Sequence, residues 1–350
     1  MIKVKLFEPD IHRNETTFRP YWFINDQLRE VGIDLILDGD SYDFLLVGQA
    51  SIADKKRPLQ ESVDMGLEKL SKIKGDYIIV DGQDAPTLIG TVDVFRHVYK
   101  DSNCKLFLKT SYYKDFDDYK KPWVLGRKYW GEGAYNVPDI HDMKPKMKLT
   151  GMNWLSTTQM NWNTPRPQYK AHDIWAFFQY PMHKTVMEHG ELQSSHYDKF
   201  RKGLHDKLAQ LEGKYNIIRM RDGKRVDQQI YYNQMYHSTI IVAAFGYGEM
   251  APRDIESAMF GSVLFKNDMS HIVTMPNPYV PFETYIPIKW DWSDFEEQVE
   301  NFFAGKDTAE DYANRLRDKF IEENDPMKRI VHVYTLFKDM DNITTYGDII

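Results

Sequence analysis

Short apolar runs alternate with amphipathic stretches through the first half of the chain. The run YIIV at 77–80 has the length and β-branched content of a buried strand, whereas apolar residues recur at helical spacing in 61–73. The expected strands are 1–7, 33–37, 43–49, 76–86 (ending in a turn) and 105–113, and the expected helices are 22–31, 61–73 and 91–100. Strands and helices that alternate at these lengths predict a parallel sheet covered by helices on both faces.

A second alternating pattern follows a less regular stretch. Residues 114–170 scatter Pro, Gly, Trp and Asn without a period, so we place a domain boundary near residue 165. Beyond it the expected strands are 173–182, 215–221, 239–245, 262–266 and 283–288, and the expected helices are 194–212, 228–238, a short one ending at 261, 292–305, 308–324 and 326–340. The patterns predict an α/β chain with two Rossmann-like doubly wound domains, 1–165 and 166–350, facing each other across a cleft.

Composition narrows the class of protein further. A length of 350 residues suits two domains, and 42% hydrophobic residues supply a substantial core. The net charge of −7, without a long basic run, argues against a nucleic-acid partner. One cysteine, Cys104, fits a reducing compartment and excludes a cluster of thiolate ligands. We find no leader sequence and no apolar run of about 18 residues, so we expect a cytoplasmic protein with no integral membrane segment.

The most informative motif is a glycine turn between an apolar strand and a short helix. Gly246 and Gly248 allow a sharp bend that brings backbone N–H groups close to an anion. Pro252 suits the first position of a helix whose N-terminus favours negative charge. Arg253 adds a forked cation, and Glu256, one helical turn later, can accept hydrogen bonds from ribose hydroxyls. The combination predicts a site for a nucleotide diphosphate.

Two other interpretations of this turn remain open. Gly246, Gly248 and Ala251 also match the G-x-G-x-x-A fingerprint of NAD(P)-dependent enzymes, with Asp268 near the expected place of the ribose-binding acid. Against this, few strands follow, and Pro252 and Arg253 replace the small residues that usually pack such a helix on its sheet. The turn can also be purely structural.

The segment 237–268 resembles the donor-binding region of a known enzyme class. Its pattern is a serine before the strand, the two glycines, the arginine, the glutamate and a glycine before the next strand, here Ser238, Gly246, Gly248, Arg253, Glu256 and Gly261. It resembles GT-B glycosyltransferases, particularly the exostosin-like and spore-maturation-like enzymes of bacteria and large viruses. The resemblance implies transfer of a sugar from a UDP- or GDP-sugar to a hydroxyl of a glycan, lipid or protein, as in glycan biosynthesis. It also implies that the glycine loop, with Tyr247, and Arg253 hold the diphosphate and that Glu256 holds the ribose. A second glutamate follows the loop sooner in the retaining enzymes of this class, so retention and inversion both stay open.

Glycosyl transfer also needs groups that act on the sugar and the acceptor. Asp84, just past the strand that ends at Asp81, is our candidate base, and a turn around Gly82 is the alternative. Glu249 in the loop and His271 after the next strand are candidates for contact with the sugar or the phosphates. Further donor-side candidates are Arg219 (or Arg221), Glu283 and Tyr285, and acceptor-side candidates are Lys109 and Tyr112.

Asp-x-Asp triplets are the signature of metal-dependent donor binding in a different glycosyltransferase architecture. Asp38-Gly39-Asp40 is the best placed of those in the chain, but a turn between two strands explains it more simply. Because a helix N-terminus and Arg253 already supply positive charge, we expect no required cofactor and no metal site. A non-catalytic module that binds nucleotide sugars or glycans, with a donor loop but no working base, is a further alternative.

Overall fold

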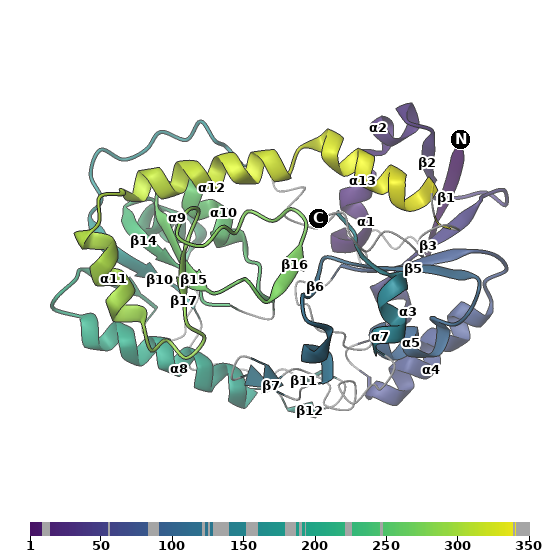
Figure 1. The fold of residues 1–350 in the computed structure, drawn as a ribbon, viewed down its shortest axis with the longest axis horizontal. Helices are drawn as coiled ribbons and strands as arrows, with labels where there is room; N and C mark the ends of the chain where they lie inside the picture. Colours follow the sequence, from purple (N-terminus) through teal and green to yellow (C-terminus); the bar gives the residue numbers. More distant parts are fainter. Residues whose placement is uncertain are drawn as a thin grey trace.

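The computed structural model describes most of the chain as two lobes that lie side by side (Figure 1). The described residues are 1–8, 15–54, 57–82, 91–120, 123–124, 127–128, 140–151, 160–178, 187–188, 191–192, 194–220, 226–245, 248–338 and 340. The N-terminal lobe is purple to blue in Figure 1, and the C-terminal lobe is mostly green.

The first lobe contains a parallel sheet, six-stranded within the described residues. In spatial order its strands are β2 (Ile33–Ile36), β1 (Ile2–Phe7), β3 (Phe44–Gly48), β4 (Tyr77–Asp81), β5 (Cys104–Lys109) and β9 (Met147–Leu149). Its side chains alternate between two buried cores because successive strand residues point to opposite faces. Leu45 and Val47 join the core under α4 (Leu59–Ser71) and α5 (Thr91–Val98), whereas Phe44 and Leu46 join the core under α1 (Glu15–Trp22) and α2 (Asn25–Glu30).

The second lobe repeats this design with a five-stranded parallel sheet. In spatial order its strands are β13 (Ile217–Arg219), β10 (His172–Ala176), β14 (Ser238–Val242), β15 (Val263–Asn267) and β17 (Ile286–Ile288). One face packs on α8 (Ser194–Leu211) and α11 (Phe295–Ala304), and the other on α9 (Gln228–Tyr236), α10 (Pro252–Met259) and α12 (Ala309–Glu323). The predicted fold class, two Rossmann-like α/β domains, is therefore confirmed.

Both sheets have a point where the strand order reverses. In each sheet, the strand that comes first in the chain lies between the second and the third. The connections that leave the first and the third strands therefore run to opposite sides of the gap between these two strands. Ligands of open α/β sheets bind at the carboxyl ends of the strands next to such a gap. In the second lobe that gap lies between β10 and β14, and the glycine turn follows β14.

A short antiparallel ladder joins the two lobes. The expected strand 105–113 is in fact two: β5 ends at Lys109, and β6 (Ser111–Tyr113) turns toward the second lobe. There β6 pairs with β16 (Ile272–Thr274), with Ile272 opposite Tyr113. Figure 1 shows β6 and β16 side by side between the lobes. Sequence patterns predicted neither the break nor β16.

The last described helix, α13 (Pro326–Lys338), returns to the first lobe (Figure 1). Its residues Ile330, Val333 and Phe337 belong to the same core as Tyr21 and Phe44. The sheets take their strands from residues 2–149 and 172–288, and the boundary near residue 165 stays a prediction. The return of α13 means that each end of the chain contributes to the first core.

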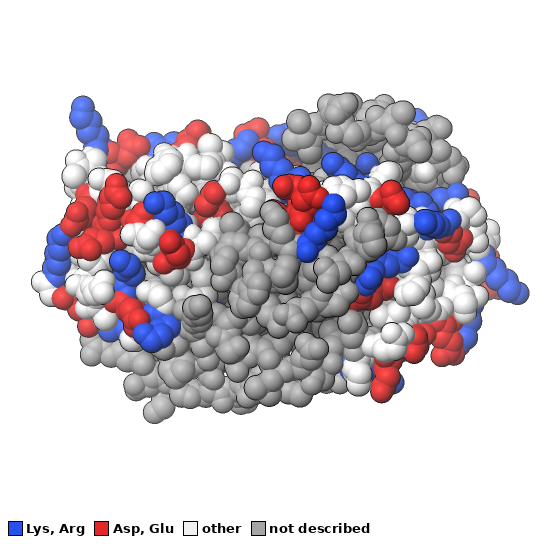
Figure 2. Space-filling view, turned by 60° about the horizontal axis from the view of Figure 1, so that its bottom comes forward, with Lys and Arg blue, Asp and Glu red and all other residues white. Residues whose placement is uncertain are grey.

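The remaining described elements are short. They are α3 (Gln49–Ile52), η1 (Phe116–Lys120), β7 (Trp123–Val124), β8 (Arg127–Lys128), α7 (Ile140–Met143), η2 (Lys144–Lys146), β11 (Met187–Glu188) and β12 (Glu191–Leu192). Among the described residues, no helix is both long and apolar enough to cross a membrane. On the face shown in Figure 2, basic and acidic side chains are interspersed over the described surface. That part of the surface lacks the concentrated positive charge with which proteins bind nucleic acid.

Candidate functional site

The predicted phosphate loop lies at the strand-order reversal of the second sheet. It follows β14, and α10 begins at Pro252, as predicted, with Ala251 as its N-cap. Gly248 is buried, whereas Gly246 and Tyr247 lie outside the described residues. The N-terminus of α10 therefore opens at the place in the sheet where the topology favours a ligand.

Arg253 bridges the two strands that flank this reversal. Its Nη1 donates a hydrogen bond to the backbone oxygen of Phe177, 2.6 Å away, and Phe177 directly follows β10. The side chain of Arg253 comes from α10, which follows β14, so the guanidinium spans the gap. One hydrogen bond uses one of the five N–H donors of a guanidinium. The structure thus places a positive charge, half-buried, beside the N-terminus of α10.

A buried ion pair supports the first turn of α10. Asp254 is fully buried, and its Oδ2 accepts the Ala251 N–H at 3.0 Å, which is half of a capping box. Lys266 Nζ lies 3.0 Å from the same oxygen, and the Tyr279 hydroxyl donates to it at 2.7 Å. This cluster, Asp254–Lys266–Tyr279, ties the end of the loop to β15 and to the segment before β17. Sequence reasoning missed it, although an acidic residue at the third helical position was a usable signal.

Glu256, the predicted ribose-binding residue, lies on α10 one turn after Arg253. It is buried, and the Tyr232 hydroxyl of α9 donates to its Oε1 at 3.1 Å. Burial raises the pKa of Glu256, while the hydrogen bond from Tyr232 and the charge of Arg253 lower it. Because the pKa is raised overall, keeping Glu256 ionised in the folded protein costs free energy.

That cost gives a pH-dependent prediction for stability. A raised pKa means that charging Glu256 above its unfolded pKa opposes folding, and that the penalty disappears in acid, where both states are protonated. We expect Glu256→Gln to raise the melting temperature at pH 7 and to leave it unchanged near pH 4. Thermal unfolding across this range checks the prediction, with Glu283→Gln, at an exposed site, as the matched control. An equal change in melting temperature at both pH values would contradict a raised pKa of Glu256.

Glu249 and His271 meet at the junction between the lobes. Glu249 is fully buried, and its Oε1 lies 3.3 Å from His271 Nε2. The His271 ring stands edge-on to Trp290 at 5.2 Å. The backbone oxygen of His271 accepts the N–H of Lys114 at 2.9 Å, which extends the β6–β16 ladder. The structure thus brings two predicted residues together, and the first lobe fixes the backbone of one of them.

Arg201 of α8 is a second cation at the loop that sequence reasoning did not include. Its Nη2 lies 3.5 Å from the backbone oxygen of Phe245, immediately before the two undescribed loop residues. Phe200, its neighbour, packs its ring on Phe245 at 4.6 Å and on Trp292 at 4.9 Å. No local pattern signals this contact, because α8 is far from the loop in sequence.

Other predicted donor-side residues lie in different surroundings. Arg219 ends β13 and pairs through Nε with Glu212 at 2.8 Å. Glu283 is exposed, and its backbone oxygen accepts a hydrogen bond from Arg315. Tyr285 is fully buried, and its hydroxyl accepts the N–H of Met269 at 3.1 Å. In this structure Tyr285 is a core residue, and Arg221 lies outside the described residues.

The acceptor-side candidates lie at the carboxyl edge of the first sheet. Lys109 and Asp81 form a fully buried ion pair with 2.8 Å between Nζ and Oδ2. Tyr112 is half-buried on β6, with its ring edge-on to Phe116 at 5.9 Å. Asp84, the candidate base, falls in 83–90, outside the described residues, so its role stays a prediction.

The Asp38-Gly39-Asp40 triplet forms the turn between β2 and β3. Gly39 has φ +114°, which favours glycine, and both aspartates are exposed. Within the described parts of the chain, no cluster of three or more His, Cys, Asp or Glu side chains is arranged to hold a metal ion.

Comparisons with known proteins bear on the fold. No protein-family model matches the chain, and no curated protein sequence does. Sucrose-phosphate synthase of Thermosynechococcus elongatus superposes with a TM-score of 0.52 at 10% identity, over 97% of this chain and 99% of that one. HepE of Anabaena, solved with UDP-glucose, gives 0.47 at 8% identity, over 97% and 100%. An α1,3-fucosyltransferase solved with GDP-fucose gives 0.40 at 10% identity, over 99% and 91%. The match to the synthase shows that the chain has the GT-B fold, two Rossmann-like domains that face each other.

Proposed function

We propose that the protein is a glycosyltransferase that moves a sugar from a nucleotide diphosphate donor to a hydroxyl acceptor. The observation that carries the proposal is the position of Arg253 and Glu256 on the first turns of α10, at the strand-order reversal of the second domain. A guanidinium suits a diphosphate, and a carboxylate one helical turn away can accept hydrogen bonds from ribose hydroxyls. The resemblance of 237–268 to the donor-binding region of exostosin-like enzymes supports the same function.

The donor diphosphate would lie between the N-terminus of α10 and Arg253. Both carry positive charge, and that charge stabilises the negative charge that develops on the leaving diphosphate. Arg201 adds a second guanidinium beside Phe245, where the loop begins. Because the chain itself supplies this charge, the proposed mechanism uses no metal ion.

The sugar would lie near Glu249 and His271. Both residues follow the carboxyl ends of central strands, β14 and β15, where the pocket of such a domain forms. A histidine held by a carboxylate can carry a positive charge beside the departing phosphate or donate a hydrogen bond to the sugar. The acceptor would approach from the first domain, past Tyr112, and Asp84 remains the predicted base.

The first test of the proposal is nucleotide binding by Arg253→Ala. UDP or GDP is expected to raise the melting temperature of the wild-type protein, because a ligand that binds only the native state stabilises it. Loss of the charged hydrogen bonds should weaken that binding about 10- to 100-fold. Isothermal titration calorimetry with UDP, GDP and NAD⁺ measures the affinities.

Arg29→Ala is the matched control for this variant. Arg29 also has a hydrogen-bonded guanidinium, with its Nε 2.6 Å from Asp34 Oδ1, but lies on α2 of the first domain. It should leave nucleotide affinity unchanged. Stabilisation by NAD⁺ and not by UDP or GDP would contradict the proposal and favour the NAD(P)-dependent alternative. Nucleotide-sugar binding without turnover on any acceptor would favour the non-catalytic module.

A further inference from the structure

A depression of about 500 Å³ lies on the second domain, at the edge of the sheet opposite the donor loop. It is lined by the segment that enters β10 and by the end of α9, including His172 and His237, which are adjacent because the His172 N–H donates to the His237 oxygen at 3.0 Å. Strand β14 begins beside it at Ser238 and reaches the donor loop after Val242. Five residues of strand span about 16 Å, so the two sites are separate. Its volume is in the range of ligand sites.

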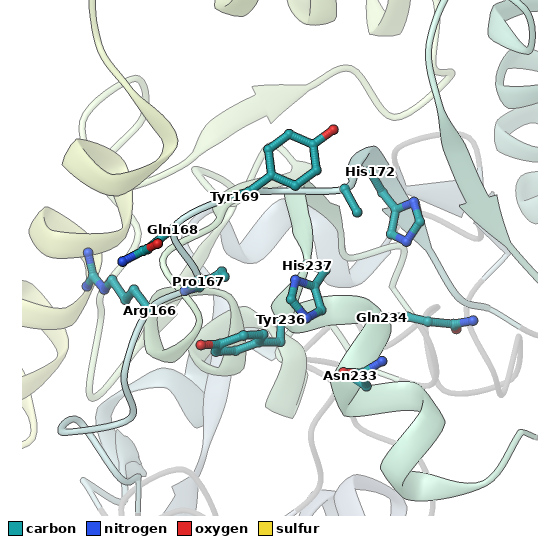
Figure 3. A pocket seen from close by; sticks show the side chains of 10 residues that line it. Arg166, Pro167, Gln168, Tyr169, His172, Asn233, Gln234, Tyr236 and His237 are labelled. Carbon is teal, nitrogen blue, oxygen red and sulfur yellow. The ribbon is translucent and has the colours of Figure 1, made fainter.

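The lining is polar and aromatic, and none of its residues is acidic. Tyr169 stands at the rim with 75% of its surface exposed, and it is the only tyrosine among the exposed large apolar side chains of the described residues. Figure 3 shows Tyr169 and His172 along one side, and Tyr236, Gln234 and Asn233 along the other. The lining of this depression is unusual in a chain with 52 acidic residues.

Two polar atoms beside the depression have no hydrogen-bond partner within the described structure. They are His172 Nδ1 and Gln234 Oε1, and both are buried. Both atoms are closed off from solvent, so part of the hydrogen-bonding capacity of these two side chains is unused beside the depression. Amide and imidazole groups present donors and acceptors together, as neighbouring hydroxyls of a sugar require. The exposed face of Tyr169 offers an apolar platform for a sugar ring.

We propose that this depression is a non-catalytic binding site for a neutral oligosaccharide, separate from the donor site. An open, carboxylate-free surface with one exposed ring and several amides suits an extended chain of hydroxyl groups. An anion is a poorer fit, because Arg166, the permanent cation of the lining, is held by Glu310 and Asn314 at 2.8 Å each. Such a site would hold a glycan on the protein without taking part in transfer.

The test uses the full chain, labelled with a fluorophore, on an array of neutral glucan, mannan, galactan and chitin oligosaccharides beside acidic ones. We expect binding to at least one neutral series. Titration calorimetry with that oligosaccharide should give about 10-fold weaker binding for Tyr169→Ala, weaker binding for Asn233→Ala, and near wild-type binding for Tyr169→Phe, which keeps the ring. Phe23→Ala, which removes an exposed ring from the first domain, is the control.

Each other outcome overturns the proposal. Binding to acidic oligosaccharides alone, or to none, removes the neutral glycan as ligand. Binding that survives both Tyr169→Ala and Asn233→Ala belongs to another surface, such as the cleft between the domains. Tyr169→Ala should keep the melting shift caused by UDP or GDP, so failure here is distinguishable from failure of the donor site.

Discussion

Asp254→Asn is expected to lower the free energy of unfolding by about 3–5 kcal/mol, because it leaves the Lys266 ammonium buried without its counter-charge. Both side chains of the pair are within 1% of complete burial, so water cannot replace the lost partner. Asparagine keeps the shape of the side chain and can still accept a hydrogen bond from Ala251 or Tyr279. The substitution therefore isolates the charge. Urea unfolding followed by tryptophan fluorescence measures the change.

Two further variants separate this effect from general damage. Asp254→Asn combined with Lys266→Met should recover most of the stability, since it removes the buried ammonium that the single variant leaves without its counter-charge. Asp81→Asn breaks a second buried pair, with Lys109, and should cost about as much stability while leaving nucleotide affinity intact. Asp254→Asn should also weaken UDP or GDP binding, because the pair holds the first turn of α10. Wild-type stability in Asp254→Asn would mean that Lys266 is neutral in the folded protein.

Local sequence patterns predicted most of the strands and helices because both have a characteristic periodicity, but α1, β9 and β16 were not predicted. The apolar run 77–80 lies within β4, and the helical spacing in 61–73 overlaps α4, which ends at Ser71. The break in the strand after Lys109 has no such local signal. Residues 105–113 read as one apolar strand, and only pairing with β16, far along the chain, bends the last three residues away. The helix α13 is likewise amphipathic, but its sequence does not show which of the two sheets its apolar face covers.

In the candidate site, the turn after β14 and the start of α10 at Pro252 were the most predictable features, and the donor-binding role of this loop stays a prediction. Glycines, a proline at the first helical position and Arg253 with Glu256 one turn apart are all local signals. The choice of candidate site residues because they lie at the end of an expected strand was less informative. Such positions are either exposed to the cleft or buried in the core, and Tyr285 and Lys109 proved to be buried. The contact of Arg201 with the loop depends on tertiary packing and has no local signature.

Glu249→Gln and His271→Ala are each expected to lower kcat by about 10²–10³-fold while leaving the affinity for the nucleotide diphosphate nearly unchanged. The reason is their position. They face each other at 3.3 Å where the two domains join, whereas Arg253 and the N-terminus of α10 supply the charge for the diphosphate. A loss confined to kcat marks an interaction made only during transfer. Steady-state kinetics with the nucleotide sugar that binds best, together with calorimetry for the nucleotide, separates the two quantities.

The double variant decides whether the pair acts as a unit. If Glu249 works by holding His271, then Glu249→Gln with His271→Ala should be no slower than His271→Ala alone, because the second substitution removes nothing that still functions. His141→Ala is the matched control, since His141 pairs with Asp117 at 3.0 Å on the exposed surface of the first domain. It should keep full activity. If the losses in kcat multiply in the double variant, the two residues contribute independently. If either single variant loses nucleotide affinity, the pair contacts the diphosphate and not the sugar.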